Sequence, residues 1–405
     1  MKRIDRRTKG VGLILVLVGL TGCGRTDSEI SVGQGTADLP RLGEPSGSEV
    51  APLVRVAPSQ GVAARVEFSG KPVGLTVGPD GAVVVGLEHD VWMVQGQPPT
   101  TTRPSWVSSQ DLLIALAGDP RFNGAALAHF QFDPATSQPN TLVRLVATAD
   151  GAILNEQRFK SEIKCLAIAP ATRPSDEADS SPKPVVLVGT VWSENASGPQ
   201  PLGVVLQPST DEQIPLRGLV GEPSAAALTT DGRLAALAAA RRGENFVTLG
   251  ELKVWSLDDP SQPRWGVSEN LANIHGLIFR PDSQALVLAH KTAGGDPVAT
   301  LFAVEDGAVL SRTPPLPANV TTLKFTPEGS GLVLGLENGL IQLHRADDLA
   351  QPPMVSRQAH VGPVQGVGFA KDTYSLISIG RDSKLLFWEP SLWTPPGSTE
   401  SLHQL

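Results

Sequence analysis

HVGPVQGVGFAKDTYSLISIGRDSKLLFW, residues 360–388, decides how this chain of 405 residues folds. The stretch contains three short apolar runs separated by two polar turns. The runs are 364–369, 376–379 and 385–388, and the turns are Lys371-Asp372 and Arg381-Asp382-Ser383. Short apolar runs joined by tight polar turns predict three antiparallel strands connected as hairpins.

Four side chains hold distinctive places in this unit. His360 precedes the first strand, Ser378 lies in the second, Asp382 is in the second turn and Trp388 ends the third strand. With these residues the unit resembles a WD40 repeat. The resemblance implies that the four side chains form one hydrogen-bonded network inside a β-propeller blade. An imidazole can bridge a hydroxyl and a carboxylate, and a buried indole N–H needs an acceptor, so we interpret the four residues as structural rather than catalytic.

The same pattern recurs upstream in weaker form. In residues 319–344, Asn338 stands where Asp382 stands and His344 where Trp388 stands. Seven such units begin near residues 73, 112, 163, 225, 274, 320 and 364. The resemblance predicts an all-β fold, a seven-bladed WD40-type β-propeller with four-stranded antiparallel blades. Six or eight blades, or two separate smaller domains, are the alternatives.

Each unit needs a fourth strand, and candidates lie between the units. They are 152–160, 213–219, 263–268, 308–313 and 353–358, with a poorer one near 103–108. The last unit has no strand after Trp388, whereas residues 62–68 (VAARVEF) precede the first unit without a partner. We therefore expect the N-terminal strand to complete the last blade and close the ring, which removes an open sheet edge.

The N-terminus has the features of an export signal. A basic segment, MKRIDRRTKG, is followed by ten mostly apolar residues, which are too few to span a bilayer as a helix. The next residues, Leu20-Thr21-Gly22-Cys23, resemble the lipobox of bacterial lipoproteins. That resemblance implies cleavage after residue 22 and lipid attachment to Cys23. An ordinary signal peptide with a chance Cys, and a signal anchor, are the alternatives.

Charge argues against a nucleic-acid partner. Residues 1–22 hold five of the 33 Lys and Arg and one of the 41 Asp and Glu, so the remaining residues include 28 basic and 40 acidic ones, with a net charge of about −12. Such a surface repels phosphate backbones. It also gives no electrostatic attraction to an anionic membrane, so the lipid has to supply the membrane attachment.

The protein is expected to have four parts. These are the signal peptide 1–22, a flexible tether 23–60, the propeller 61–390 and a polar tail 391–405. The tether is rich in Gly, Ser, Pro and acidic residues, and a flexible segment of that length reaches roughly 35 Å. If Cys23 is acylated, Cys165 is the remaining Cys, and a small buried hydrophobe is favoured over a reactive thiol at that position.

No constellation of catalytic residues is evident. The seven His are scattered, and none stands at a metal-ligand spacing from a Cys or carboxylate. Glu88-His89-Asp90 is typical of a hairpin turn. The expected innermost strands, such as VGLTV and GVGF, are apolar or small. The sequence therefore predicts no enzyme activity, no cofactor and no metal site.

One face of the ring is expected to carry unequal loops. The segments between the second and third strands are long in units two to five: 132–140, 193–200, 240–249 and 291–297. They supply aromatic and basic residues, which are common anchors for a protein partner. The candidate partner-binding residues are Phe132, Trp192, Arg241, Arg242, Phe246 and His290. Loop drift without consequence is the alternative.

The sequence thus predicts a lipid-anchored, extracytoplasmic WD40-type scaffold that is monomeric and binds protein partners of unknown identity. Gly24 after the Cys favours the outer over the inner membrane, by resemblance to enterobacterial sorting. A propeller lipoprotein of outer-membrane assembly is a narrower alternative. An enzyme or small-ligand sensor that uses the central channel is the other.

Overall fold

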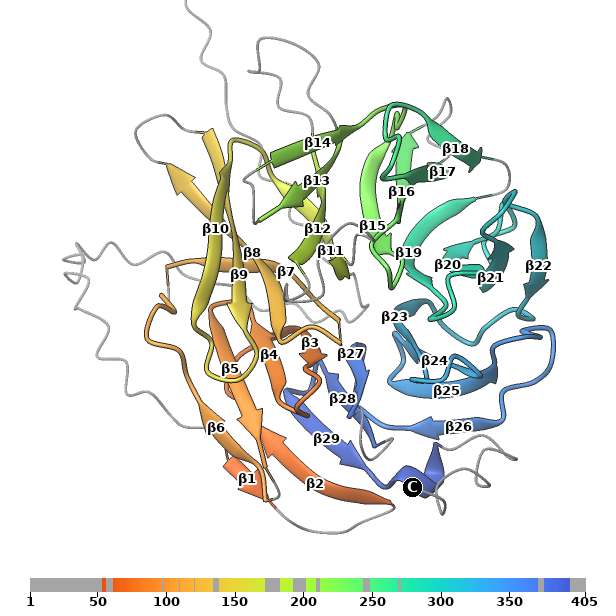
Figure 1. The fold of residues 1–405 in the computed structure, drawn as a ribbon. Coiled ribbons are helices and arrows are strands. Elements are labelled where there is room, and N and C mark those ends of the chain that lie inside the picture. The colour runs from red at the N-terminus through yellow and green to blue at the C-terminus, as the bar shows by residue number, and fades with distance from the viewer. Residues whose placement is uncertain are drawn as a thin grey trace, which may run out of the picture. The chain divides into compact units, whose positions relative to one another are not determined.

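The computed structural model in Figure 1 describes most of the protein beyond residue 60. The described residues are 53–55, 61–96, 98–108, 110–119, 121–133, 138–171, 183–191, 202–208, 212–242, 248–268, 271–370 and 375–393. They belong to one compact unit, Val50–Leu405. The predicted signal peptide with Cys23, and the predicted tether outside residues 53–55, lie outside the described residues.

The described strands form seven antiparallel sheets arranged in a ring, so the fold is a seven-bladed β-propeller (Figure 1). The innermost strands of neighbouring blades contact one another around the full circle, including those of the last and first blades. The predicted fold class and the blade count of seven are both confirmed. We call the ends of the ring the a–b face and the b–c face. The first carries the turns between the first and second strands of each blade, and the second those between the second and third.

Each blade runs from an inner strand at the channel to an outer strand at the rim, and its strands follow in that order. Blade 1 contains β3 (Pro72–Val77), β4 (Val83–Leu87), β5 (Asp90–Gln95) and β6 (Thr100–Thr102); blade 2 contains β7 (Leu112–Gly118), β8 (Gly124–Asp133), β9 (Gln138–Ala147) and β10 (Ile153–Phe159); blade 3 contains β11 (Ile163–Ala171), β12 (Lys183–Thr190), β13 (Gly203–Gln207) and β14 (Glu212–Leu216). Blade 4 contains β15 (Glu222–Leu228), β16 (Leu234–Arg242), β17 (Thr248–Ser256) and β18 (Pro263–Val267); blade 5 contains β19 (Ala272–Phe279), β20 (Ala285–Lys291), β21 (Pro297–Ala303) and β22 (Val309–Arg312); blade 6 contains β23 (Val320–Phe325), β24 (Gly331–Leu336), β25 (Leu340–Arg345) and β26 (Val355–Gln358). Blade 7 contains β27 (Val364–Phe369), β28 (Leu376–Gly380), β29 (Lys384–Trp388), β2 (Val62–Glu67) and β1 (Leu53–Arg55).

The hydrophobic core is divided among the spaces between blades. The described residues form seven apolar clusters, and each cluster lies between two adjacent blades. The alternation of side chains along a strand explains this arrangement, because successive residues point to opposite faces of the sheet. In β16, Ala236 and Ala238 pack toward blade 5, whereas Ala235 and Leu237 pack toward blade 3. Because both faces are buried, LAALAAA folds as a strand despite its high helix propensity.

Blade 7 combines the two ends of the described sequence. β2 pairs antiparallel with β29, with Arg65 opposite Leu386 and Glu67 opposite Lys384, which confirms the predicted closure. Ser383 adds a link to blade 1 by donating a hydrogen bond from its Oγ to the carbonyl oxygen of Gly70, 2.8 Å away. β1 then pairs with β2 as a fifth strand, inside the segment that the sequence predicted to be tether.

Two predicted boundaries need correction. The fourth strand of blade 1 is β6, at residues 100–102, not 103–108, because Trp106 instead packs into the cluster between blades 1 and 2. The predicted tail begins at residue 391, but a short 3-10 helix, η2 (Pro390–Leu392), brings Trp393 onto Trp388 with ring centroids 5.6 Å apart. Trp393 is fully buried and therefore belongs to the propeller. The five other predicted fourth strands correspond to β10, β14, β18, β22 and β26.

Every blade shares a local irregularity that the sequence did not reveal. In each, the pairing of the first two strands shifts by a bulge near the start of the inner strand, as between Val364 and Gly366 in blade 7. A bulge bends the strand and increases its twist. The seven bulges all lie toward the b–c face, where the connections between blades arrive.

Candidate functional site

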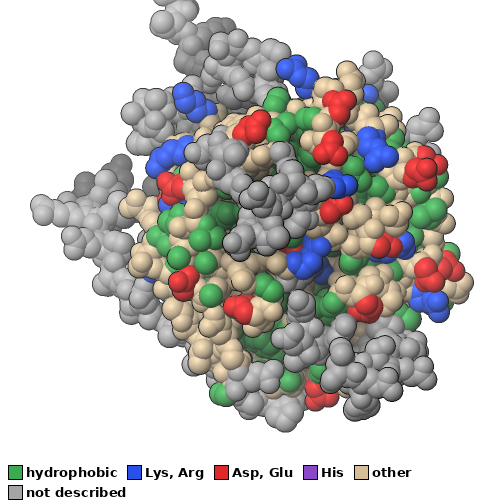
Figure 2. Space-filling model, in the orientation of Figure 1, with side chains coloured by type: hydrophobic (Ala, Val, Ile, Leu, Met, Phe, Trp, Pro, Cys, Tyr) green, Lys and Arg blue, Asp and Glu red, His purple; other side chains and the backbone are tan. Residues whose placement is uncertain are grey.

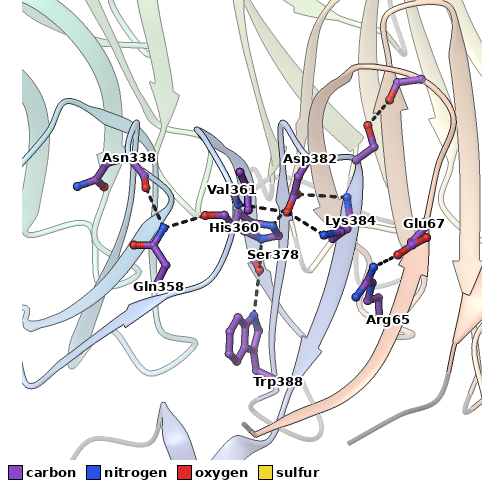
Figure 3. A network of polar contacts seen from close by, with 12 residues as sticks. Arg65, Glu67, Asn338, Gln358, His360, Val361, Ser378, Asp382, Lys384 and Trp388 are labelled. Carbon is purple, nitrogen blue, oxygen red and sulfur yellow. Dashed lines mark hydrogen bonds and ion pairs between the residues drawn. The ribbon is translucent and has the colours of Figure 1, made fainter. Parts of the chain in front are cut away.

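The four side chains of the last repeat form a continuous network of hydrogen bonds in blade 7 (Figure 3). The His360 ring lies 3.0 Å from Asp382 through its Nδ1 and 2.8 Å from the Ser378 Oγ through its Nε2. Trp388 donates its Nε1–H to the same Oγ across 2.9 Å. The Nδ1–H of His360 can donate to the carboxylate, and the Ser378 hydroxyl can accept the indole proton while it shares a hydrogen bond with Nε2.

Asp382 also holds the segment that enters the blade. Its Oδ2 accepts the backbone N–H of Val361, and its Oδ1 accepts that of Lys384. Burial acts to raise the pKa of the Asp382 carboxyl. The hydrogen bond and charge of His360, the Val361 N–H and Lys384 outweigh burial, so the pKa lies below its usual value. Gly380 gives the imidazole its space, because a Cβ there would lie 2.3 Å from the His360 Cγ.

The serine, histidine and tryptophan of this network are closed to solvent, which decides its role. Ser378 is fully buried, and His360 and Trp388 are nearly so. Ser378, His360 and Asp382 are hydrogen-bonded in the order Ser–His–Asp, as in the catalytic triad of hydrolases. No substrate can reach the serine hydroxyl here, however. The arrangement ties the entering segment, the second strand and the third strand together. Gln358 extends it toward blade 6 by donating to the carbonyl oxygens of Asn338 and His360 (Figure 3).

Blade 4 makes the same connection with different chemistry. Glu251, on β17, accepts the backbone N–H groups of Val220 and Gly221, at 2.5 and 2.7 Å, just before β15 begins. The Lys253 Nζ lies 3.0 Å from the second carboxylate oxygen of Glu251. Both side chains line a groove of about 430 Å³ on the b–c side of this blade. The groove is rimmed by an exposed charged residue and two exposed apolar residues: Arg241, Val220 (65% exposed) and Leu249 (39% exposed). We call these five residues, Val220, Arg241, Leu249, Glu251 and Lys253, the blade 4 rim.

The six predicted partner-binding residues have three different outcomes: one is exposed, one is buried, and four lie wholly or by their side chains outside the described residues. Arg241 is exposed on β16, opposite Leu249 on β17, at the blade 4 rim. His290 is buried and held by the Lys291 carbonyl oxygen at 2.8 Å and the Thr300 Oγ1 at 2.9 Å, so its prediction as a surface anchor is wrong. Trp192 and Phe246, and the side chains of Phe132 and Arg242, lie outside the described residues.

Two of the predicted long loops are partly strand. β8 and β9 remain paired as far as Asp133 opposite Gln138, and β16 and β17 as far as Arg242 opposite Thr248. A paired hairpin holds its side chains in a fixed register, whereas an open loop does not. Arg241 is therefore presented on a rigid element.

Blade 2 contains a second polar cluster, at its border with blade 1. The Arg144 guanidinium lies 5.1 Å from the centroid of the Trp106 ring and pairs with Asp111 at 3.4 Å and Glu156 at 3.0 Å. His129 packs edge-on against Trp106. Burial, followed by the charge of Arg144, lowers the pKa of His129 to about 4. The cluster links the connection between blades 1 and 2 to the second blade, a structural role.

Cys165 is free and buried, as the sequence predicted. Burial raises the pKa of its thiol to about 12, so the nucleophilic thiolate is scarce at neutral pH. Among the described residues, no three His, Cys, Asp or Glu side chains lie close enough together to hold a metal ion. No helix in that part of the protein is long and apolar enough to cross a membrane.

Lys324, in the inner strand of blade 6, was not predicted as a site residue. It lines a central cavity of about 510 Å³ at the a–b end of the ring, to which all seven inner strands contribute. The signal was present in the sequence, because Lys324 stands between Leu323 and Phe325 in the run TLKF, which was expected to be an inner strand. Figure 2 shows a contrasting exterior, where basic and acidic side chains are interspersed on the face in view.

No protein-family model matches the sequence, and no curated protein matches it. Solved structures match its fold. A chain of the "Crystal Structure of Mitotic Checkpoint Complex" is similar with a TM-score of 0.62 and 14% identity, over 89% of this chain and 98% of that chain. A chain of Kuenenia stuttgartiensis hydrazine synthase is similar with a TM-score of 0.62 and 13% identity, over 83% of this chain and 100% of that chain. At these identities the likeness concerns the β-propeller alone.

Proposed function

We propose that this protein is a lipid-anchored, extracytoplasmic scaffold of WD40 type that binds a protein partner through the blade 4 rim. The observation that carries the proposal is the groove on blade 4. It combines exposed Val220 and Leu249 with an exposed Arg241 and the fixed charges of Glu251 and Lys253. Apolar area next to a small number of oriented charges is typical of protein-binding surfaces.

The rigidity of the rim supports a binding role. Arg241 and Leu249 face each other on paired strands, and Glu251 holds the segment that contains Val220 through two backbone N–H groups. A backbone that is already ordered loses little conformational entropy when a partner binds. The proposed mechanism is therefore presentation of a preformed surface rather than chemistry.

The rim can be tested with two variants on one blade. The test uses the full-length protein, crosslinked in its native envelope, and identifies the crosslinked partners by mass spectrometry. Arg241→Ala combined with Leu249→Ser should strongly reduce the recovery of these partners. Arg233→Ala is the matched control, because Arg233 is equally exposed on blade 4 but lies at the a–b turn. Both variants should keep the wild-type unfolding midpoint. If the same partners are recovered in the same amounts with the rim variant, the site is wrong.

The proposed anchor has a separate test. Cys23→Ala should move the protein from the membrane fraction to the soluble fraction. The wild-type N-terminal peptide should carry acyl groups at Cys23 when analysed by mass spectrometry. A Cys23→Ala variant that still sediments with membranes would contradict the lipid anchor. It would not bear on the proposal that the blade 4 rim binds a partner. Recovery of outer-membrane insertion machinery as the crosslinked partner would support the assembly-factor alternative.

A further inference from the structure

The central cavity has a chemistry distinct from that of the rim. Its walls come from the inner strands of all seven blades and combine polar groups with apolar side chains, with Leu75, Leu116, Leu277, Phe325 and Val367 among the apolar lining residues. Its volume, about 510 Å³, is within the range of roughly 300–1,000 Å³ that is usual for small-molecule sites. The cavity therefore has the size and the lining for an organic ligand.

Three charged residues line this cavity, and two of them neutralise each other. Arg121 donates to Asp119 through its Nε at 2.9 Å and a terminal nitrogen at 2.6 Å, a bidentate pair in the a–b turn of blade 2. Its backbone N–H donates to the same carboxylate, also at 2.9 Å. The third basic or acidic side chain, that of Lys324, donates no hydrogen bond to any described residue and forms no ion pair with one. The cavity lining thus has one basic group that no described carboxylate pairs with, in a protein whose net charge is −8.

The packing of the ring does not explain why a lysine stands at position 324. Blade 6 is otherwise held by leucines, and an apolar side chain would fill the same space without a charge to desolvate. Burial lowers the pKa of Lys324; the nearby Asp119 carboxylate opposes this shift and Arg121 adds to it. An ammonium group at this site that has no carboxylate partner is what an incoming anion would neutralise.

We propose that the a–b end of the central channel binds a small organic anion, with the Lys324 ammonium group holding a carboxylate or phosphate head and the apolar side chains of the cavity holding its body. Arg121 is less free to contribute, because Asp119 already occupies two of its nitrogens. The site lies at the opposite end of the ring from the blade 4 rim, so a ligand and a protein partner can be bound at the same time.

The test uses four probes and full-length protein. Phenylacetate and phenyl phosphate carry the two head groups, phenylacetamide is the neutral counterpart, and inorganic phosphate lacks the apolar body. Saturation-transfer NMR and calorimetry should detect the two organic anions, with the neutral amide and the inorganic ion binding at least about tenfold more weakly. Whichever head group binds more tightly identifies the source of the ligand.

Lys324→Met should weaken the better organic anion by about tenfold or more, and Lys324→Arg should retain most of the affinity. Lys164→Met is the matched control, because Lys164 also lies on an inner strand but is exposed and outside the cavity lining. Bound anion should raise the unfolding temperature of wild type and of Lys164→Met but not that of Lys324→Met. The proposal is overturned if neither organic anion binds at concentrations on the order of 10 mM. It is equally overturned if the amide binds as tightly, or if both lysine variants behave alike.

Discussion

Blades 6 and 7 are stabilised differently at equivalent positions: blade 7 has a polar hydrogen-bonded network where blade 6 has packed leucine side chains. The two blades can be superimposed by register, because Val320 pairs with Leu336 as Val364 pairs with Gly380. Four positions then differ in kind. In blade 7 they are His360, Ser378, Gly380 and Trp388, and in blade 6 they are Leu316, Leu334, Leu336 and His344. Where blade 7 places an imidazole over a glycine, blade 6 fills the space with leucine side chains.

A blade of this fold does not need the polar network, because blade 6 has the same strand pairing without it. Leu316, Leu334 and Leu336 are buried in one apolar cluster between blades 5 and 6. A buried leucine contributes roughly 1.5–3 kcal/mol, whereas a hydrogen bond contributes on the order of 1 kcal/mol net. The two solutions therefore stabilise a blade to a similar degree. They differ in how they fail, because a polar network that loses one member leaves buried groups unpaired, whereas a packed cluster loses area and gains a cavity.

Blade 7 differs from blade 6 in a second way, which gives the largest expected effect. Blade 6 is one continuous segment, but blade 7 needs β2 from the other end of the described sequence. Deleting residues 61–68 removes Val66 and Phe68 from the core between blades 7 and 1. The deletion should remove most of the free energy of unfolding, which is typically 5–15 kcal/mol for a domain. The open edge of β29 should also make the protein aggregate. Circular dichroism and urea unfolding measure the loss of folded structure and of stability.

Deleting residues 24–49 is the control, because it shortens the N-terminal segment without touching β1 or β2. The unfolding midpoint should then stay at the wild-type value. A folded, cooperative protein without residues 61–68 would show that the ring does not depend on closure by its N-terminal strand.

Replacing the serine at the centre of the blade 7 network should have the next largest effect. Ser378→Ala leaves the Trp388 N–H and one ring nitrogen of His360 unpaired in a buried site, at a cost of about 2–3 kcal/mol. In a Trp388→Phe background, the indole N–H is already absent, so the same change should cost at least about 1 kcal/mol less. Urea unfolding of the wild type, the two single variants and the double variant measures this coupling.

Blade 6 supplies the comparison for that experiment. Leu334→Ala, at the position equivalent to Ser378, should cost about 2–5 kcal/mol by opening a cavity. It should show no comparable coupling to His344→Phe, because Leu334 has no hydrogen bond to lose. Equal coupling in the two blades would contradict the distinction between a polar network and a packed cluster.

A smaller effect should appear only on acidification. Burial lowers the pKa of His344 to about 4, and its Nδ1 has no hydrogen-bond partner. The unfolded protein takes up this proton near pH 6.5, so the stabilising contribution is fully present above that pH and is lost as pH falls from 6.5 toward 4. Between pH 7 and pH 5 the loss should be about 1–2 kcal/mol for this residue.

His344→Phe should remove that part of the acid sensitivity, measured as the difference in unfolding free energy between pH 7 and pH 5. His129, whose pKa is also lowered to about 4 by burial, should keep its own contribution in the variant. An unchanged pH dependence would mean that His344 is already protonated in the folded protein or that it reaches solvent.

The sequence predicted the architecture because each blade repeats a local pattern. Apolar runs, tight turns and their phase identify the three inner strands of a blade, and counting strands leaves residues 62–68 as the partner of the last blade. The boundaries were wrong where tertiary packing decided them. Trp106 lies in a segment predicted as a strand and Trp393 in one predicted as a tail, but each ring fills a gap in the core that is formed by distant residues.

The sites were harder to predict, for two physical reasons. His290 stood beside a predicted loop, yet Thr300 and the Lys291 carbonyl oxygen draw its ring into the blade, and no sequence pattern reports that contact. Glu251 and Val220 are 31 residues apart, and Lys324 comes under the charges of Asp119 and Arg121 only across the ring. Alternation along a strand predicts which face a residue is on, but not which blade lies opposite.

The smallest expected effect comes from completing one element of the motif in blade 6. Asn338 occupies the place of Asp382, and its Oδ1 accepts the N–H of Leu340 as Asp382 accepts that of Lys384. Asn338→Asp preserves this turn bond, but the side chain is exposed and has Leu316 rather than a histidine at the equivalent entering position. The change in unfolding free energy should therefore stay within about 0.5 kcal/mol. Asp382→Asn in blade 7 should cost clearly more, because the partly buried carboxylate accepts from His360. Matching values from the two substitutions would mean that the histidine, not the turn residue, carries the stabilisation of blade 7.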